Sequence, residues 1–336
     1  MSSSTSEPRR IRRAYVWIVA IVVVLFAILT GFWFYAASQL DEITSRAIED
    51  AERNGVLVSC LGRDVVGYPF RLGIVCDDLA LDVPRNGVTV DAGSFRSAAQ
   101  IYQPNLVVSE LDAPVRIETA DGPPVDIGWN LAQASTSFWT EGLDRISIAT
   151  DAPRVAIGDR SIFNASGGEL HARRREDDLD IAGVQRSAKI DLPQLSGVPN
   201  FDLSTDLTVQ GAADWLSGGA SGLSARELFA DRSGTLRSLV LTFHGDPTGA
   251  DVSGDFAFSA DGLLSGTFDL AVTSPERLAS IVGSIAPEAA SIANTVASVI
   301  PYVGTTENGR TTIRVTADDG QLTAGVIPLG QIPPLE

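Results

Sequence analysis

The sequence predicts a mainly β protein with a single N-terminal transmembrane helix. Three observations support this fold class: an uncharged apolar run at residues 14–37, alternating β-branched runs through residues 56–336, and Asp-Gly pairs between several of those runs. We expect residues 56–336 to form one large antiparallel β-rich exported domain. Its sheet should be curved or open and barrel-like, with one or two amphipathic helices.

The composition excludes several classes of protein. Of the 336 residues, 44% are hydrophobic, which is enough to bury a core and excludes wholesale disorder. The formal net charge is −17, so we expect no nucleic-acid partner, because binding phosphate backbones needs a basic face. Two Cys and two His are too few for a Cys-rich zinc module. We expect neither a metal nor a cofactor.

Residues 14–37 form the predicted membrane anchor. About 20 apolar residues span a bilayer as a helix, and this run has 24 residues without a charge. The preceding tail, residues 1–13, carries four Arg, so the positive-inside rule places the tail in the cytoplasm and the body outside. We therefore expect a single-pass inner-membrane protein whose C-terminal domain is periplasmic and whose residues 14–37 contact the lipid bilayer.

A cleaved signal peptide is the alternative for this run. Signal cores have about 7–15 apolar residues, and the segment Phe34–Ser38 offers no clean A-x-A site. Both points favour an uncleaved anchor. Trp17, Trp33 and Tyr35 lie near the two ends of the run, where we expect their amphipathic rings at the membrane interface.

Residues 38–55 are expected to continue as a juxtamembrane helix. The apolar residues fall on one stripe: Leu40, Ile43, Ala47, Ile48 and Ala51. Gly55 should end the helix, since Gly tolerates a left-handed cap. We expect the stripe to dock on the exported domain. A solvated stalk is the alternative, but on a stalk the stripe would bury nothing.

The only cysteines, Cys60 and Cys76, are predicted to form a disulfide. Their midpoint, position 68, lies in the turn-forming segment Gly67–Pro69. A hairpin turning there would set the cysteines opposite each other, and an oxidising compartment would join them. A reactive pair is the alternative. Because no cationic residue or C-x-x-C spacing flanks either sulfur, we favour the structural bond.

Two segments resemble a known family. The segment Gly67–Arg71 between the two cysteines and the C-terminal stretch Gly320–Leu335 are similar to the bacterial family called domain of unknown function 2125. The resemblance covers nearly the whole chain. It implies a layout like that of membrane-anchored AsmA-like envelope proteins, with a long β-rich exported body. It implies no activity and no catalytic residues.

Three turns with nearly the same sequence divide the exported domain. Residues 119–122, 259–262 and 316–320 each contain Ala-Asp and end in Gly, and Asp-Gly supplies the positive φ angles of hairpin turns. Alternating runs flank these turns, so the pattern indicates an antiparallel meander. The segment Leu192–Asn200, with two Pro and one Gly, marks an expected internal join near residue 195.

Residues 274–300 carry the strongest helical pattern. Ser274 should cap this helix, with a proline at its first position. An apolar stripe that includes Ile285 and Ile292 follows, and Pro287 should kink or split the helix. The opposite face is nearly uncharged. We expect the segment either to plug the sheet or to meet a lipid or ligand.

We recognise no catalytic motif in the sequence, so we do not expect an enzyme. The sequence contains no G-x-S-x-G, no G-x-G-x-x-G, no Walker A loop and no H-E-x-x-H. His171 precedes the charged run Arg173–Asp178, which is typical of a hairpin loop or a solvated strand face.

The segment Gly67–Arg71 is the candidate ligand-binding segment. Tyr68 and Phe70 would wall an apolar groove, and Arg71 would hold a phosphate or carboxylate. The alternative, which we favour, is a turn with aromatic core residues and an Arg that bridges to nearby acids.

The sequence leads to two functional hypotheses. The first is a membrane-tethered protein that holds a lipid or other amphiphile in an apolar groove, with the helix containing Ile285 and Ile292 as its lid. The second is an envelope scaffold that recruits a protein partner through its acidic exported surface.

Overall fold

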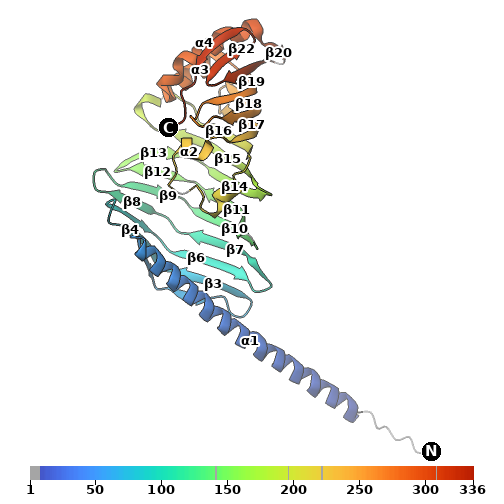
Figure 1. Ribbon diagram of the computed structural model, residues 1–336. Helices are drawn as coiled ribbons and strands as arrows, with labels where there is room; N and C mark the ends of the chain where they lie inside the picture. The colour runs from blue at the N-terminus through green and yellow to red at the C-terminus, as the bar shows by residue number, and fades with distance from the viewer. Residues whose placement is uncertain (1–7, 141, 196, 221, 308) are drawn as a thin grey trace, which may run out of the picture.

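The computed structural model describes residues 8–336 except residues 141, 196, 221 and 308 (Figure 1). One 46-residue helix, α1 (Pro8–Arg53), leads into a long antiparallel β structure. Figure 1 shows α1 at one end of the sheet and two shorter helices at the other. We call these the near end and the far end. The predicted mainly β fold is confirmed, and the sheet is open rather than closed.

The strands form two groups, which we call sheet A and sheet B. Sheet A runs in pairing order β1 (Leu57–Leu61), β4 (Asp78–Val83), β5 (Val88–Ala92), β8 (Val115–Thr119), β9 (Val125–Gly128), β12 (Arg154–Ile157) and β13 (Arg160–Asn164). The pair β13–β15 joins it to sheet B.

Sheet B is the longer group, and its first half lies towards the near end. In pairing order it begins β2 (Asp64–Val66), β3 (Arg71–Cys76), β6 (Phe95–Gln100), β7 (Gln103–Leu111), β10 (Leu131–Trp139), β11 (Gly142–Asp151), β14 (Gly167–Arg175) and β15 (Asp178–Ile190).

The second half of sheet B reaches the far end. It continues β16 (Phe201–Val209), β17 (Ser233–Phe243), β18 (Gly249–Phe258), β19 (Leu264–Thr273), β21 (Arg310–Asp318), β22 (Gln321–Ala324) and β23 (Ile327–Gln331), and β20 (Thr305–Glu307) also pairs with β21.

Sheet A bends into sheet B along a line of short connections. β5 leads into β6 through only Gly93 and Ser94, and β7 leads into β8 through residues 112–114. Backbone hydrogen bonds continue through the bend, for example from Asp112 N–H to Ser94 C=O at 2.9 Å. Gly93 is required there, since a Cβ would lie 2.8 Å from the Asp112 carbonyl oxygen. The two sheets are therefore halves of one folded sheet.

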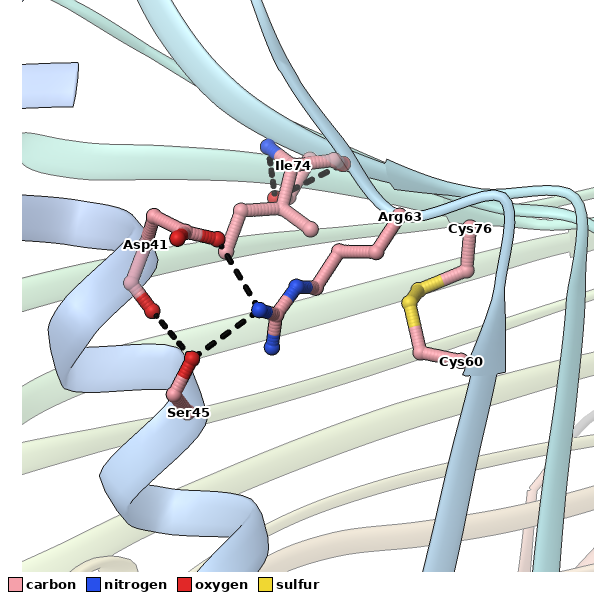
Figure 2. Close-up of a disulfide and its surroundings, with 7 residues drawn as sticks. Asp41, Ser45, Cys60, Arg63, Ile74 and Cys76 are labelled. Atoms are coloured by element: carbon pink, nitrogen blue, oxygen red, sulfur yellow. Dashed lines mark hydrogen bonds and ion pairs between the residues drawn. A yellow bond between two sulfur atoms is a disulfide. The ribbon is translucent and has the colours of Figure 1, made fainter. Parts of the chain in front are cut away.

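The predicted disulfide between Cys60 and Cys76 is present, but the expected register is wrong. The chain does turn at residues 67–70, between β2 and β3, where Asp64 pairs with Val75. Cys60, however, belongs to β1 in sheet A and pairs with Leu79. The bond therefore connects the two sheets across the bend instead of two strands of one hairpin (Figure 2).

The helix α1 continues without a break from the apolar run through residues 38–53, as the sequence predicts. Within the described residues it is the one helix long and apolar enough to cross a membrane. It runs unbroken to Arg53, and Gly55 follows with φ +85°, as its role as a helix terminator requires. Residues 1–7 of the predicted basic tail lie outside the described residues.

The second half of α1 docks on the sheet, as expected, although through different contacts. Arg63, between β1 and β2, forms an ion pair with Asp41 at 3.0 Å and donates a hydrogen bond to the Ser45 hydroxyl at 2.9 Å (Figure 2). Ile43, expected on the docking stripe, is 59% exposed. Polar side chains therefore make these two contacts, and the stripe is only partly covered.

Two short helices form the far end, so the helical segment expected at residues 274–300 is split in two rather than kinked. α3 (Pro275–Ile285) and α4 (Ala290–Val303) are separated at Pro287, as predicted. Ser274 occupies the N-cap position of α3 but has φ +54° and makes no side-chain capping hydrogen bond. The remaining described α-helix is α2 (Ala225–Phe229), with a capping box at Ser224.

The Asp-Gly turns connect paired strands, which confirms the meander. Residues 119–122 lie between β8 and β9, residues 259–262 between β18 and β19, and residues 316–320 at the end of β21 before β22. The expected join near residue 195 falls in the connection between β15 and β16, where η1 (Pro193–Leu195) lies. The sheet continues across it, because β15 and β16 pair directly.

Removing the disulfide should destabilise the protein, because it closes a loop of about 15 residues. The double variant Cys60→Ser with Cys76→Ser should lose about 3 kcal/mol of unfolding free energy in the chain-entropy estimate. Urea unfolding of the full chain in detergent, followed by circular dichroism, measures this loss. A reducing agent should lower the stability of the wild type and leave the double variant unchanged; equal stability of the two oxidised proteins would contradict the prediction.

Candidate ligand-binding surface

An unbroken row of uncharged side chains crosses sheet B from the near end to the far end. Each member pairs directly with the next on the neighbouring strand, so all of them lie on one face. The row is Ala99, Val107, Thr136, Ile146, Ala172, Ile181, Leu207, Leu236, Gly254, Phe268 and Val315. We call the face that carries this row the apolar face.

Sheet A carries a matching row. Val58, Leu81, Val90, Ile117, Val125 and Ile157 are paired in sequence across its strands. The disulfide shows that both rows lie on the inner side of the bend. Cys60 shares its face with Leu79 in sheet A, Cys76 shares its face with Phe95 in sheet B, and the two sulfurs are bonded. The apolar face therefore continues from one sheet into the other.

Coverage of the apolar face differs along the molecule. At the far end Val272, Ile313 and Val315 are buried with Ile300 of α4 in a hydrophobic cluster. In the middle, η2 (Ala213–Ser217) contacts β11, β14 and β15, and Trp215 packs beside Leu179 and Val209. Towards the near end the row is only half-buried, and Leu170 is 45% exposed. This part of the apolar face is open.

The predicted lid residues occupy different environments at the far end. Ile292 packs on the hydrophobic cluster and lines an apolar cavity of about 210 Å³ between α3, α4 and β19. Gly330 of β23 allows this contact, because a Cβ there would lie 2.9 Å from Ile292 Cγ1. Ile285, at the end of α3, is 50% exposed. Only Ile292 belongs to the lining of the cavity.

The candidate segment Gly67–Arg71 contacts α1 at the near end. The Trp33 indole, only 6% exposed, donates from Nε1 to the Arg71 carbonyl oxygen at 2.7 Å. Tyr68 Oη and Thr30 Oγ1 are 2.8 Å apart, and the Tyr68 ring meets the Trp33 ring edge-on at 5.4 Å. Trp33, expected near the lipid interface, therefore packs on the β2–β3 hairpin, and its expected place at the interface stays a prediction.

The exposed part of this segment is Phe70 with the side chain of Arg71. Phe70 is 59% exposed, and no described carboxylate lies within ion-pairing distance of Arg71. Arg71 therefore does not bridge to nearby acidic residues, as the turn interpretation expected. The structure also separates this segment from Ile285 and Ile292, which lie at the opposite end of the sheet (Figure 1). The five candidate residues do not form one site.

A charge network that the sequence did not indicate lies on the outer face of sheet B. Arg173, Arg175 and Arg237 approach the Asp180 carboxylate at 2.8, 3.6 and 3.8 Å, and the Thr208 hydroxyl donates to it at 2.6 Å. Burial raises the pKa of Asp180, but the hydrogen bonds from Thr208 and Arg173 outweigh it and hold the pKa below its usual value.

The network could not be found from sequence spacing because its members come from β14, β15, β16 and β17. Strand register alone brings them together. The charged run at residues 173–178 was predicted as a hairpin loop or solvated face, and the structure places it at the β14–β15 hairpin. Among the described residues no group of three or more His, Cys, Asp or Glu side chains is placed to hold a metal ion.

Fold and surface together define a class: a β-rich protein with one N-terminal helix long and apolar enough to cross a membrane, and with an open apolar face. The family described as an uncharacterized protein conserved in bacteria, DUF2125, matches residues 33–333, and the chain belongs to this family. Neither a curated protein nor a solved structure matches the chain. The likeness to AsmA-like envelope proteins stays a prediction.

The variant Trp33→Phe should loosen the contact between α1 and the β2–β3 hairpin. It keeps an aromatic ring but leaves the Arg71 carbonyl without its donor, which costs about 1 kcal/mol. Hydrogen–deuterium exchange of residues 63–76 should therefore quicken roughly fivefold. Trp17→Phe, in the exposed part of α1, is the matched control and should leave this exchange unchanged. Equal exchange in both variants would contradict the predicted role of Trp33.

The Asp180 network should make the protein sensitive to acid. A carboxylate whose pKa is lower in the folded state than in the unfolded state, where it is about 3.9, stabilises the fold at pH values above the unfolded pKa. This stabilisation is lost as the pH falls through the folded pKa. The variant Asp180→Asn should lose about 1 to 3 kcal/mol at pH 7. Its unfolding free energy should then fall less between pH 5 and pH 2 than that of the wild type.

Urea unfolding at a series of pH values measures this difference. Asp159→Asn, in the β12–β13 turn, changes a carboxylate for which no ion pair is found among the described residues, and it should retain the acid dependence of the wild type. Parallel pH profiles for the wild type and Asp180→Asn would show that the network does not stabilise the fold.

Proposed function

We propose that the protein holds a lipid or another amphiphile on its apolar face. The observation that supports this is the uncharged row through sheet B, which is half-buried and uncovered towards the near end. A row of this length left in water would be costly, since each Å² of apolar surface removed from water stabilises by roughly 25 cal/mol. Large exposed apolar patches usually mark binding sites for ligands, partners or membranes.

The proposed location follows from α1. Its apolar run would anchor the protein in the inner membrane, with the Arg-rich tail in the cytoplasm and the folded sheet in the periplasm. An oxidising periplasm would support the Cys60–Cys76 bond. The near end of the apolar face would then lie beside the membrane, which is the source of the ligand. In this proposal the protein is a binding protein and not an enzyme.

The ligand class follows from the two faces of sheet B. The apolar face offers alkyl side chains and few hydrogen-bond donors, so it suits acyl chains. The outer face bears Arg173, Asp180, Asp206 and Arg237, which suit water. An amphiphile would therefore lie with its chains along the apolar face and its polar group at the edge of the sheet.

A charge placed in the row should reduce lipid binding. The variant Ile148→Asp changes a half-buried residue on the apolar face of β11, and its neighbour Ala149 points to the outer face. Full-length Ile148→Asp, purified in detergent, should retain several-fold less phospholipid than the wild type when extracted lipid is quantified by mass spectrometry, because burying a carboxylate is costly.

Ala149→Asp is the matched control and should retain as much lipid as the wild type. Circular dichroism and disulfide content verify that both variants fold. Lipid retention that is equal in both variants, or absent in the wild type, would count against the apolar face as a lipid-binding surface. In the second case the scaffold hypothesis would predict instead a protein partner whose capture weakens with salt.

A further inference from the structure

Exposed aromatic side chains occupy the tips of three neighbouring hairpins of sheet B. Tyr68 and Phe70 lie at the β2–β3 tip, Tyr102 at the β6–β7 tip and Trp139 at the β10–β11 tip, and their exposed fractions are 44, 59, 74 and 71%. The register places these tips on one edge, since Arg71 pairs with Gln100 and the end of β10 pairs with β7. We call these four side chains the aromatic edge.

Other hairpin tips of the same fold have a different composition. The next tip along this edge, between β14 and β15, consists of Glu176 and Asp177. The tips of sheet A, at residues 84–87, 120–124 and 158–159, contain no aromatic residue. Aromatic tips are therefore confined to the part of the edge nearest α1. Random surface exposure of apolar residues does not explain this distribution.

The contacts of α1 fix the level of the aromatic edge relative to a bilayer. The uncharged run of 24 residues is about 36 Å long as a helix, and a bilayer core is about 30 Å thick. Tyr68 contacts Thr30 and lies near the rings of Phe26 and Phe34, all in the second half of that run. The β2–β3 tip therefore lies level with the outer leaflet when α1 spans the membrane.

The surface beside these tips is apolar on its outer side as well. Ala98, Leu106 and Val108 line a shallow hollow of about 240 Å³, and Arg71 lies at the same hollow. Farther along, the outer face carries the Asp180 network. An Arg without a described carboxylate partner, beside apolar and aromatic residues, fits the boundary between acyl chains and lipid phosphates.

We propose that the aromatic edge docks on the outer leaflet of the membrane that α1 spans, with Arg71 paired to a lipid phosphate. Tyr and Trp favour this boundary because one end of each ring system is apolar and the other is polar. Docking holds the sheet against the bilayer and opens the near end of the apolar face at the lipid surface. This inference rests on α1 spanning a membrane and not on the proposed lipid holding.

Photo-crosslinking of the full chain, reconstituted into lipid vesicles, tests the proposal. Three variants carry p-benzoyl-phenylalanine at an aromatic tip, in place of Phe70, Tyr102 or Trp139. Two controls place it at the sheet A tips, at Asp121 and Asp159. A further variant carries it at Ile148 on the apolar face. After irradiation in phosphatidylethanolamine–phosphatidylglycerol vesicles, mass spectrometry quantifies lipid adducts, and disulfide content reports folding.

The proposal expects several-fold more lipid adducts at all three aromatic tips than at the two control tips. Transfer to lipid-free detergent before irradiation should abolish the tip adducts, because they report a bilayer and not a retained molecule. Adducts at Phe70 alone would overturn the proposal, since α1 by itself holds that tip at the membrane. Equal yields at tips and controls would overturn it too. An adduct at Ile148 that survives in detergent reports lipid holding separately.

Arg71→Glu provides a second measurement that does not depend on crosslinking chemistry. The reversed charge should repel anionic phosphates, so the yield of tip adducts at Tyr102 should fall in vesicles rich in phosphatidylglycerol. Arg85→Glu, at the β4–β5 tip, is the matched control and should leave that yield unchanged. An unchanged yield in Arg71→Glu would remove the phosphate contact from the proposal.

Discussion

The in-register pairing of long antiparallel strands is the constraint on which the rest of the structure depends. Successive side chains of a strand point to opposite faces, and directly paired residues share a face. A shift of one residue in any pair would turn charged side chains such as Arg173 and Asp180 towards the inner side. The apolar face and the Asp180 network are thus two results of one register, and each restricts it.

The bend between the two sheets determines how the strand register places the two apolar rows relative to each other. A flat sheet would have one apolar face open to water along its whole area. Here the bend turns the rows of sheets A and B towards the same inner side, and the Cys60–Cys76 bond secures the bend at the near end, beside α1 (Figure 2). At the far end, beyond the last strand of sheet A, α4 covers the apolar face, and Ile300 is buried in one hydrophobic cluster with Ile313.

Local signals in the sequence were sufficient to predict much of the fold. The long apolar N-terminal helix, the Asp-Gly turns, the break at Pro287 and the bond between the cysteines each depend on a few adjacent residues or on the cysteine count. The bend could not be predicted, because it depends on connections as short as Gly93-Ser94 that resemble ordinary strand irregularities. The placement of Cys60 in sheet A failed for the same reason.

The sequence could not show how the candidate residues are grouped, because strand pairing brings together residues that are far apart in the sequence. The sequence marks Gly67–Arg71 as a candidate ligand-binding segment, and the structure places Phe70 exposed at a hairpin tip. The contact of Trp33 with this segment could not be predicted, because spacing along a helix does not show which face a hairpin covers. Tyr102 and Trp139 carry no signal in the sequence that connects them, and only the register places them on one edge with Phe70.

The unbroken course of α1 has a mechanical consequence. Trp33 and Asp41 lie on the same helix and contact the sheet at two separate points, Arg71 of β3 and Arg63 between β1 and β2, so a tilt of the helix should tilt the sheet with it. In a bilayer, a helix with an apolar stretch longer than the hydrocarbon core tilts to fit. Any change in bilayer thickness would then be transmitted to the sheet as a rotation, and the angle of the sheet would report the thickness of the membrane.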